Sequence, residues 1–541
     1  MRLISLMLIL AVVAGCNSKD GAASKRADSI FKYNLGQQPT TMNPLSSTDA
    51  YSSRVQAYVI ESLAERDDDT YDWKPALSTK FEIAPNGLEY TFTLREGVKW
   101  HDGKPFTAED VKFSFDAIMD KDNKYKTAHL KSYFENIESC EIVSPNVVKF
   151  KAKSKYFGNF DVVAGMDIVP RHLYENPSKD QEKKLNKTLV GTGPYIFDKF
   201  TKGKSIVLKK NSNWWGNSAP SQKGMHQFEA ILMRFIKDGT IAIQRMERED
   251  LDFIALNAEE FVKKTSSKNW GEKVFKVKTE NQAPKGYGFI GWNMKSDIFK
   301  SRDVRLALYK LINRPLMIKK FDFDMNLPAT GPWYQQSVYA DPNVKPVMYD
   351  PKSALDILRK DGWKDTDGDR ILDKKINGKK VKLSFTILEP NKEFIKYLTI
   401  FKEDAKKAGV DVNIKQVEWN TFIKKLDERS FDAVRLAWSG GSVDIDPKQI
   451  WHSASYANQG SNFIGYENKK VDKLIDQARE TLDKQARIKK LQEVYREIAN
   501  DVPYAFLFNS QYAFYGHTKH TKRPKDTFKY SVGLNHWWIE K

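Results

Sequence analysis

Two aspartates in one glycine-containing loop have a type and spacing that could support chemistry. Asp444 and Asp446 follow Gly440-Gly441 in residues 434–453, which read VRLAWSGGSVDIDPKQIWHS. Paired carboxylates can serve as general acid and base when the pKa of one of them is raised. A periplasmic hydrolase is therefore one hypothesis. It is the remote one, because the sequence has no G-x-S-x-G motif, no phosphate-binding Walker loop and no convincing nucleophile–base pair. We expect that the chain is not an enzyme.

A second group of acids lies in residues 365–373, which read DTDGDRILD. Carboxylates at alternate positions can supply oxygen ligands to a calcium ion. Such a loop has glycine at its sixth position and glutamate at its twelfth, where this segment has Arg370 and Ile376. We therefore expect an acidic turn between a helix and a strand, with no metal bound. The weak calcium candidates are Asp365, Asp367, Asp369 and Asp373.

The N-terminus has the features of a bacterial export signal. One arginine precedes an apolar stretch from Leu3 to Val13, which is shorter than the roughly 20 residues that a membrane-spanning helix needs. The letters VAGC that end at Cys16 resemble a lipobox, in which cleavage precedes a cysteine that is then acylated. We predict a signal peptide at 1–15, a lipidated tether at 16–27 and a location on the periplasmic side of the cell envelope. The alternative is an ordinary secretory signal with an incidental cysteine.

Composition predicts a globular chain of several domains. The 541 residues exceed what one hydrophobic core usually supports, and 13 Trp, 23 Tyr and 31 Phe can fill several cores. The net charge of +18 comes from basic residues interleaved with acidic ones, so we expect no nucleic-acid partner. If Cys16 is lipidated, the other cysteine, Cys140, has no intramolecular partner and is predicted to be a buried, inert thiol.

Hydrophobic periodicity predicts a mixed α/β fold. Apolar and polar residues alternate at 90–95, as in a half-buried strand. Thr107 and Asp110 have the spacing of a helix N-terminus, and apolar residues then recur on one helical face. The same helical spacing recurs at 304–312, with Pro315 expected to end that helix. Further elements are a strand at 410–414 and helices at 394–405, 471–482 and 488–498.

Several motifs occur in an order that resembles one known family. The longest, GLEYTFTLREGVKWHDGKPFTAEDVKFSFDAI at 87–118, is similar to the signature of the family 5 extracellular solute-binding proteins. These are the oligopeptide, dipeptide and nickel receptors of bacterial ABC importers. The other motifs are TTMNPL (40–45), GTGPY (191–195), FIGWN (289–293), DVRLALYKLINR (303–314), GSNFIGYENKKVDKLIDQAR (460–479) and VPYAFLF (502–508).

The resemblance implies a two-lobed periplasmic-binding-protein fold of the large type, cluster C, with an additional subdomain. In such a flytrap the lobes close over the ligand, and the importer binds the closed form. Two crossing strands near 285–292 and 502–508 are expected to form the hinge. The implied parts are lobe I at 28–58, 188–288 and 505–541, the subdomain at 59–187 and lobe II at 289–504.

The family also suggests which residues bind the ligand. Its peptide-binding members use a Trp-x-x-Asp motif to pair with the peptide ammonium, but here the third residue after Trp438 is Gly441. Asp444 is therefore the implied amine anchor, since a buried ammonium needs a charged partner. Arg435 is implied to meet the peptide carboxylate, with Trp438 as an apolar wall. Asp446, followed by proline, is expected to begin a helix. Further implied cleft residues are Asn43, Trp292 and Asn293.

Each of these roles has a structural alternative. Asp444 could be a solvated loop acid, Arg435 a member of an internal salt bridge, and Trp438 a core residue. The implied function is a monomeric receptor that captures peptides and delivers them to a membrane permease, without a cofactor and attached to the membrane only through its lipid. Because the family aspartate is missing at Gly441, a sugar, an opine or a metal chelate is the alternative ligand.

Overall fold

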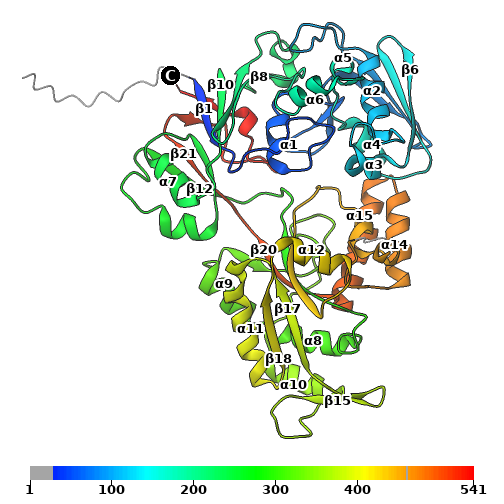
Figure 1. Cartoon of the computed structure of the whole chain (residues 1–541), viewed down its shortest axis with the longest axis vertical. Helices are drawn as coiled ribbons and strands as arrows, with labels where there is room; N and C mark the ends of the chain where they lie inside the picture. Colours follow the sequence, from blue (N-terminus) through cyan, green and yellow to red (C-terminus); the bar gives the residue numbers. More distant parts are fainter. Residues whose placement is uncertain (1–28, 458–460, 541) are drawn as a thin grey trace, which may run out of the picture.

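The computed structural model describes residues 29–457 and 461–540. Cys16, the predicted signal peptide and the whole predicted tether lie outside the described residues. The predicted mixed α/β composition is confirmed, since three large sheets are accompanied by helices (Figure 1). We name the parts by these sheets: lobe I has the seven-stranded sheet, the subdomain the four-stranded sheet and lobe II the six-stranded sheet.

Lobe I is built around a strand from the start of the described chain. β1 pairs in parallel with both β10 and β11, which lie far away in the sequence. Phe31, Leu208 and Ile231, on neighbouring strands, are fully buried in the lobe's core. In spatial order the strands are β12 (Val274–Thr279), β21 (Ala513–Thr518), β11 (Phe253–Leu256), β1 (Ile30–Asn34), β10 (Ala230–Arg234), β9 (Ser205–Lys210) and β8 (Tyr195–Thr201).

The subdomain covers its four-stranded sheet with helices. The sheet order is β4 (Ser78–Ile83), β5 (Glu89–Leu94), β7 (Val147–Ala152) and β6 (Ile137–Ser144). The predicted strand at 90–95 is β5, and α2 (Ala108–Met119) begins where the sequence predicts it. There the backbone N–H of Thr107 donates a 2.9 Å hydrogen bond to Asp110. The thiol of Cys140 is buried as predicted, and burial raises its pKa to about 12.

Lobe II contains the six-stranded sheet and most of the long helices. The strand order is β14 (Asn326–Pro328), β20 (Tyr504–Ser510), β13 (Tyr287–Trp292), β19 (Ala433–Trp438), β17 (Ser384–Glu389) and β18 (Asp411–Gln416). The predicted strand at 410–414 is β18. The predicted helices at 394–405, 471–482 and 488–498 are α11 (Ile395–Lys407), α14 (Lys469–Glu480) and α15 (Lys484–Asp501).

The helix predicted at 304–312 differs in its ending. α8 (Arg302–Lys310) stops before Pro315, and the proline lies in the first turn of the next helix, α9 (Arg314–Phe321). The prediction that Pro315 ends this helix is therefore wrong, because α8 already ends at Lys310. Proline lacks a backbone N–H and suits a first turn, where that N–H would have no helical partner, so Pro315 belongs to the start of α9.

The chain passes between the two lobes at two places. Residues 280–286 link β12 of lobe I to β13 of lobe II, and residues 511–512 link β20 to β21, as the long red strand in Figure 1 shows. Residues 505–510 thus pair with lobe II and not with lobe I, where the sequence analysis placed them, because β20 hydrogen-bonds to both β13 and β14. The remaining domain boundaries stay a prediction.

Lobe II also touches the subdomain directly. The helices α14 and α15 lie beneath α3 (Ala128–Phe134) and α4 (Gly158–Ala164) (Figure 1). A backbone hydrogen bond of 2.9 Å from Phe157 to the carbonyl of Arg479 joins the two parts there. Asp444 and Asp446 lie at this second junction.

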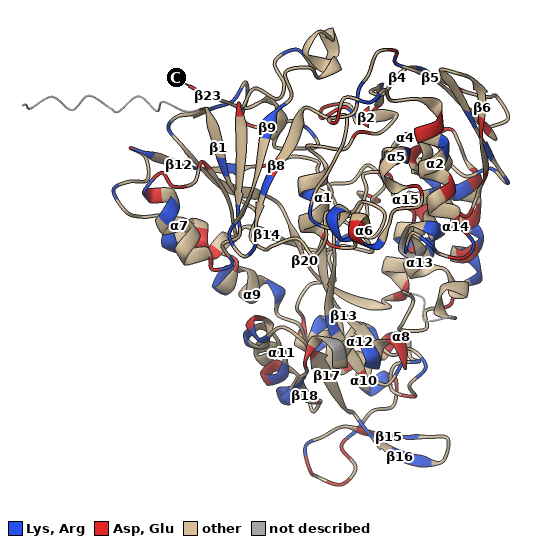
Figure 2. Ribbon diagram, turned by 45° about the horizontal axis from the view of Figure 1, so that its top comes forward, with Lys and Arg blue, Asp and Glu red and all other residues tan. Residues whose placement is uncertain are grey.

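Charged residues of both signs are mixed along the surface helices. Figure 2 shows blue and red segments alternating on α14, α15 and the subdomain, without a stripe of one sign. Within the ranges that the structure describes, none of the helices combines the length and the apolar character needed to cross a bilayer.

Candidate ligand-binding site

Asp444 lies where lobe II meets the subdomain, and its side chain is only 10% exposed. Its Oδ2 atom is 3.4 Å from Nη2 of Arg66, in β2 (Ala64–Arg66) of the subdomain. Its Oδ1 atom accepts a hydrogen bond from the hydroxyl of Tyr339 and lies 3.8 Å from Nη2 of Arg487 in α15. The implied amine anchor is thus a partly buried carboxylate that faces two guanidinium groups.

Arg66 is fixed on the subdomain side by several other groups. Its Nη2 atom lies 2.8 Å from Oδ2 of Asp161 in α4, and its Nη1 atom donates a 2.7 Å hydrogen bond to the carbonyl of Tyr71. The rings of Tyr71 and Trp73 lie 4.4 Å and 4.1 Å from the guanidinium carbon. Burial raises the pKa of the Asp161 carboxyl, while the charge of Arg66 opposes that rise.

Asp446 forms a second polar contact between the two parts. Its Oδ2 atom accepts a 2.8 Å hydrogen bond from the hydroxyl of Tyr156 in the subdomain and also pairs with Arg479 of α14. The guanidinium of Arg479 lies over the Tyr156 ring, 4.2 Å from its centroid. The Oδ1 atom accepts a hydrogen bond from the backbone N–H of Lys448, the first residue of α13 (Lys448–Trp451). Asp446 does not begin the helix as predicted, because Pro447 is the N-cap of α13; it precedes that helix and joins lobe II to the subdomain.

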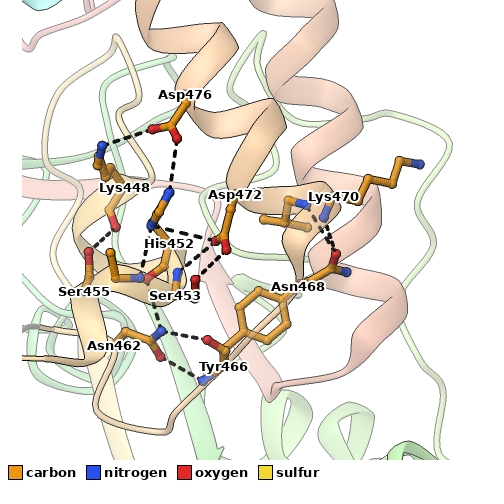
Figure 3. Close-up of polar contacts among 12 residues, drawn as sticks. Lys448, His452, Ser453, Ser455, Asn462, Tyr466, Asn468, Lys470, Asp472 and Asp476 are labelled. Carbon is orange, nitrogen blue, oxygen red and sulfur yellow. Dashed lines mark hydrogen bonds and ion pairs between the residues drawn. The ribbon is translucent and has the colours of Figure 1, made fainter.

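The segment after α13 is tied to α14 by a polar network (Figure 3). Nε2 of His452 lies 3.3 Å from Asp476, and its Nδ1 accepts a hydrogen bond from the backbone of Ala454. The hydroxyl of Ser453 donates to Asp472 and not to His452, so this pair is not arranged as nucleophile and base. The network fixes the start of α14, the helix whose other end carries the arginine that pairs with Asp446.

Arg435 lies in the middle of the lobe II sheet, on β19, and is 6% exposed. Its Nε atom is 3.8 Å from Oε2 of the fully buried Glu389, and its guanidinium lies over the ring of Phe394. Neither Nε nor Oε2 has a hydrogen-bond partner among the described residues. Burial raises the pKa of the Glu389 carboxyl to about 7, despite the opposing charge of Arg435. Burial also lowers the pKa of the Arg435 guanidinium to about 10.

Trp438 ends β19 beside the first crossing segment. Its ring is half-buried and packs against Phe289 and Phe463, with centroids 6.1 Å and 6.0 Å away. Gly441, at the position of the family aspartate, has a φ of +63°, a conformation that favours glycine. A Cβ on Gly440 would lie 2.3 Å from the carbonyl oxygen of Pro284, in the crossing segment. The positive φ therefore explains Gly441, and close backbone packing explains Gly440.

The three residues taken from the other family motifs have structural partners. Trp292 is 0% exposed and packs against Phe299 and Phe385 in the core, so its indole cannot line a cleft. Asn293 donates a 2.8 Å hydrogen bond to the carbonyl of Phe431. Asn43 accepts one from the backbone of Leu45. Asn43 also lines a pocket of about 320 Å³ between residues 40–46 and the subdomain. We do not propose Trp292 or Asn293 as ligand contacts.

The acidic segment at 365–373 is neutralised by lysines from the adjoining hairpin of β15 (Asp373–Ile376) and β16 (Lys379–Lys382). Carboxylate oxygens of Asp365, Asp367 and Asp373 lie within 4.8 Å of one another. Lys380 lies 2.8 Å from Asp367 and 3.2 Å from Asp373. Its hydrogen bond is the main cause that lowers the pKa of Asp367 to about 2. The fourth acid, Asp369, pairs with Lys382.

Several residues that surround the predicted anchors lie outside the motifs that pointed to them. Arg66 and Asp161 belong to the subdomain, and Glu389 ends the strand beside β19. The contact between Arg66 and Asp444 joins positions 378 residues apart, so no local pattern could reveal it. A partial signal exists for Arg66, because the spacing of an arginine from Tyr71 and Trp73 in a short hairpin permits stacking.

Two comparisons concern the same relative. The oligopeptide-binding protein AppA of Bacillus subtilis (strain 168) is 29% identical to this chain over 566 residues, covering 100% of this chain and 99% of AppA. A solved structure of AppA from Bacillus subtilis in complex with a nonapeptide superposes with a TM-score of 0.74 at 28% identity, covering 95% and 99% of the two chains.

A more distant structure shares the fold. NikA from Brucella suis, in complex with Fe(III)-EDTA, has a TM-score of 0.78 at 19% identity, covering 95% of this chain and 100% of NikA. These neighbours confirm the predicted two-lobed periplasmic-binding-protein fold. The family model described as bacterial extracellular solute-binding proteins, family 5 Middle, matches residues 72–462, and the chain therefore belongs to the family 5 extracellular solute-binding proteins of ABC importers.

Proposed function

We propose that this protein is the receptor of a bacterial ABC importer and captures oligopeptides between its lobes. The observation that carries the proposal is the similarity to AppA, which extends over the whole chain. The solved structure of AppA contains a nonapeptide. A receptor of this kind changes its open–closed equilibrium when a ligand binds, and the two crossings at 280–286 and 511–512 suit such a motion. It performs no reaction on the peptide.

The charged groups on lobe II suit the two ends of a peptide. Asp444 would bind the ammonium, and Arg435, whose Nε has no hydrogen-bond partner among the described residues, would bind the carboxylate. Strand-like hydrogen bonds would satisfy the peptide backbone between them. Trp438 would contribute an apolar wall, since it is only half-buried at the end of β19. Asp446 would hold the subdomain against lobe II without touching the peptide.

The receptor would act at the outer face of a membrane and hand its ligand to a permease. The lipobox-like VAGC that ends at Cys16 supports a lipid anchor as its attachment. No nucleic acid or cofactor has a part in this function. We infer a monomer, as the flytrap mechanism needs only the two lobes of one chain.

Analysis of the natural ligand tests the proposal. The protein is purified without denaturation, the bound material is released with acid, and mass spectrometry identifies it. We expect a mixture of oligopeptides, which calorimetry should show to rebind after the protein has been refolded. Incubation with the same peptides should leave them uncleaved. A sugar, an opine or a metal chelate in the released material would replace the peptide assignment, and cleaved peptides would revive the hydrolase alternative.

A further inference from the structure

The position proposed for the peptide ammonium is occupied by a side chain of the protein itself. Arg66 provides the hydrogen bond that the structure gives to Oδ2 of Asp444, at 3.4 Å. The carboxylate is largely withdrawn from water, and a buried charge without a partner is costly. Arg487 does not replace this contact, because its Nη2 atom is 3.8 Å from the other oxygen, Oδ1.

Arg66 does not depend on Asp444 for its own stabilisation. Its contact with Asp161 is 2.8 Å long, within the range of strong charged hydrogen bonds, whereas the contact with Asp444 is longer at 3.4 Å. The carbonyl of Tyr71 and the two flanking rings hold the guanidinium from the subdomain side. If Asp444 gained another partner, Arg66 would keep all of these contacts.

Arg487 is likewise held by groups other than Asp444. Its Nη1 atom donates hydrogen bonds of 3.0 Å to the carbonyls of Thr481 and Leu482. Its guanidinium also lies over the ring of Phe157, 4.3 Å from the centroid. Both arginines would keep their main partners without Asp444, but only Arg66 makes a hydrogen bond to Asp444 that a ligand ammonium could take over.

We propose that Arg66 is a specificity-determining residue that competes with the ligand ammonium for Asp444. The inference rests on the proposed function. Without a cationic ligand, Arg66 neutralises Asp444. A bound ammonium takes the place at Oδ2, and Arg66 remains with Asp161. After the exchange Asp161 pairs with Arg66 and Asp444 pairs with the ammonium, so each carboxylate has a close cation of its own. A ligand without a cation at this end cannot replace Arg66 and leaves it paired with Asp444. The competition therefore lowers the affinity of such a ligand less than that of a ligand with a free ammonium.

Calorimetry with two synthetic peptides tests the competition. The probes are a nonapeptide of three Ser-Thr-Ala repeats, whose only charges are at its termini, and the N-acetylated form of the same peptide. Removing an internal competitor raises the apparent affinity by the reciprocal of the fraction of sites that the competitor had left free. Arg66→Gln should therefore bind the free-amine peptide at least about threefold more tightly than the wild type does. It should bind the acetylated peptide with unchanged affinity.

A double-mutant cycle identifies the group for which Arg66 competes. In an Asp444→Asn background the gain from Arg66→Gln should disappear, because the contested carboxylate is gone. The matched control is Arg171→Gln, which removes an exposed arginine of the same subdomain that pairs with Glu109 and Glu175. This control should change neither affinity.

A second variant, Arg66→Lys, tests the same competition if Arg66→Gln fails to fold. Arg66→Gln leaves Asp161 without its cation, which is a risk to the subdomain. Arg66→Lys keeps a cation for Asp161 but lacks the guanidinium, whose Nη2 atom contacts both carboxylates while Nη1 donates to the carbonyl of Tyr71. It should show a smaller gain for the free amine, with a melting temperature near that of the wild type.

A loss of peptide affinity in the Arg66 variants, instead of a gain, would overturn the inference. If folded Arg66→Lys and Arg66→Gln proteins bind both peptides more weakly, Arg66 closes the lobes over the ligand instead of competing with it. Unchanged affinity for the free amine would also refute the competition, while leaving peptide binding intact. If the wild type binds neither probe and releases no peptide in mass spectrometry, the proposed function itself is wrong, and the inference is wrong with it.

Discussion

Gly286 and Trp438 approach each other so closely that a side chain on the glycine would collide with the peptide backbone. A Cβ on Gly286 would lie 2.5 Å from the carbonyl oxygen of Trp438. Gly286 ends the crossing segment 280–286, and Trp438 ends the strand that carries Arg435. The first hinge segment therefore packs directly on the loop that leads to Asp444, so lobe movement and ligand contacts share one piece of backbone.

Substitution of Gly286 by alanine should disturb this contact. The clash is with backbone, which cannot rotate away, so we expect Gly286→Ala to lose about 1–3 kcal/mol of unfolding free energy, as in overpacked sites. Gly288→Ala, two residues further along in β13, is the matched control, because its Cβ would meet nothing closer than 3.7 Å. Urea titration of both variants gives the comparison. Equal stabilities would show that the hinge segment shifts freely.

Asp444→Asn should weaken binding of a free-amine peptide by at least about tenfold, because removing a buried charged partner costs about 2–5 kcal/mol. N-acetylation of the peptide should weaken the wild type strongly and the variant little. Calorimetry of both proteins with both peptides measures the coupling between the mutation and the acetylation, as in a double-mutant cycle. Asp446→Asn serves as the comparison, and it should retain the full acetylation penalty. Equal penalties in Asp444→Asn and the wild type would exclude Asp444 as the anchor.

Much of the fold could be predicted because its signals are local. The spacing of Thr107 and Asp110 and the apolar periodicity of α2, α11, α14 and α15 all lie within single elements. Pro315 shows the limit, since the same residue suits the end of one helix and the first turn of the next. The sheet to which 505–510 belong depends on pairing between distant strands, and no local pattern encodes that choice.

The candidate site was only partly predictable for the same reason. Asp444 and Arg435 were found through one motif, but their partners, Arg66 and Glu389, come from other segments. Trp292 and Asn293 lie in a motif that is similar to one of the family, yet in the structure Trp292 packs in the core and Asn293 makes an internal hydrogen bond. A shared motif reports the fold as readily as the binding site, and only the packing of distant segments separates the two.

Cys16→Ser should abolish lipid attachment, because the acyl acceptor is the cysteine at the end of VAGC. Labelling of the expressing bacteria with radioactive palmitate, followed by electrophoresis, measures the attachment. The precursor should also accumulate uncleaved. Cys140→Ser is the control, and it should retain the label, since that thiol is buried in the subdomain. Labelled Cys16→Ser protein would contradict the lipobox assignment.

Calcium should not stabilise the acidic segment at 365–373. Lys380 and Lys382 already neutralise its carboxylates, and a cation would have to displace them. We expect melting temperatures with calcium and with a chelator to agree within about a degree, whereas binding at a hundredfold excess over Kd would add about 2.7 kcal/mol. In Lys380→Gln with Lys382→Gln a calcium-dependent shift would become possible, so this variant is the positive comparison. A shift in the wild type would refute the prediction.

The pair of Glu389 and Arg435 should make peptide binding depend on pH. Burial raises the pKa of Glu389 to about 7, so its carboxyl is neutral in acid and ionised in alkali. When Glu389 is neutral, Arg435 can give its whole charge to the peptide carboxylate. When it is ionised, the two carboxylates compete for one guanidinium. Affinity should therefore fall as pH rises from about 6 to 8, and binding near pH 7 should take up protons.

The variant Glu389→Gln separates this pair from other titrating groups. It should bind the nonapeptide of Ser-Thr-Ala repeats with nearly constant affinity over the same pH range, at the level that the wild type reaches in acid. The neighbouring hydroxyl of Tyr397, which donates to Asp322, is not expected to interfere, since burial raises its pKa. A peptide with an amidated C-terminus supplies the second control, because it lacks the carboxylate and should bind weakly without a pH slope. If the amidated peptide shows the same slope as the free acid, Arg435 does not hold the peptide carboxylate.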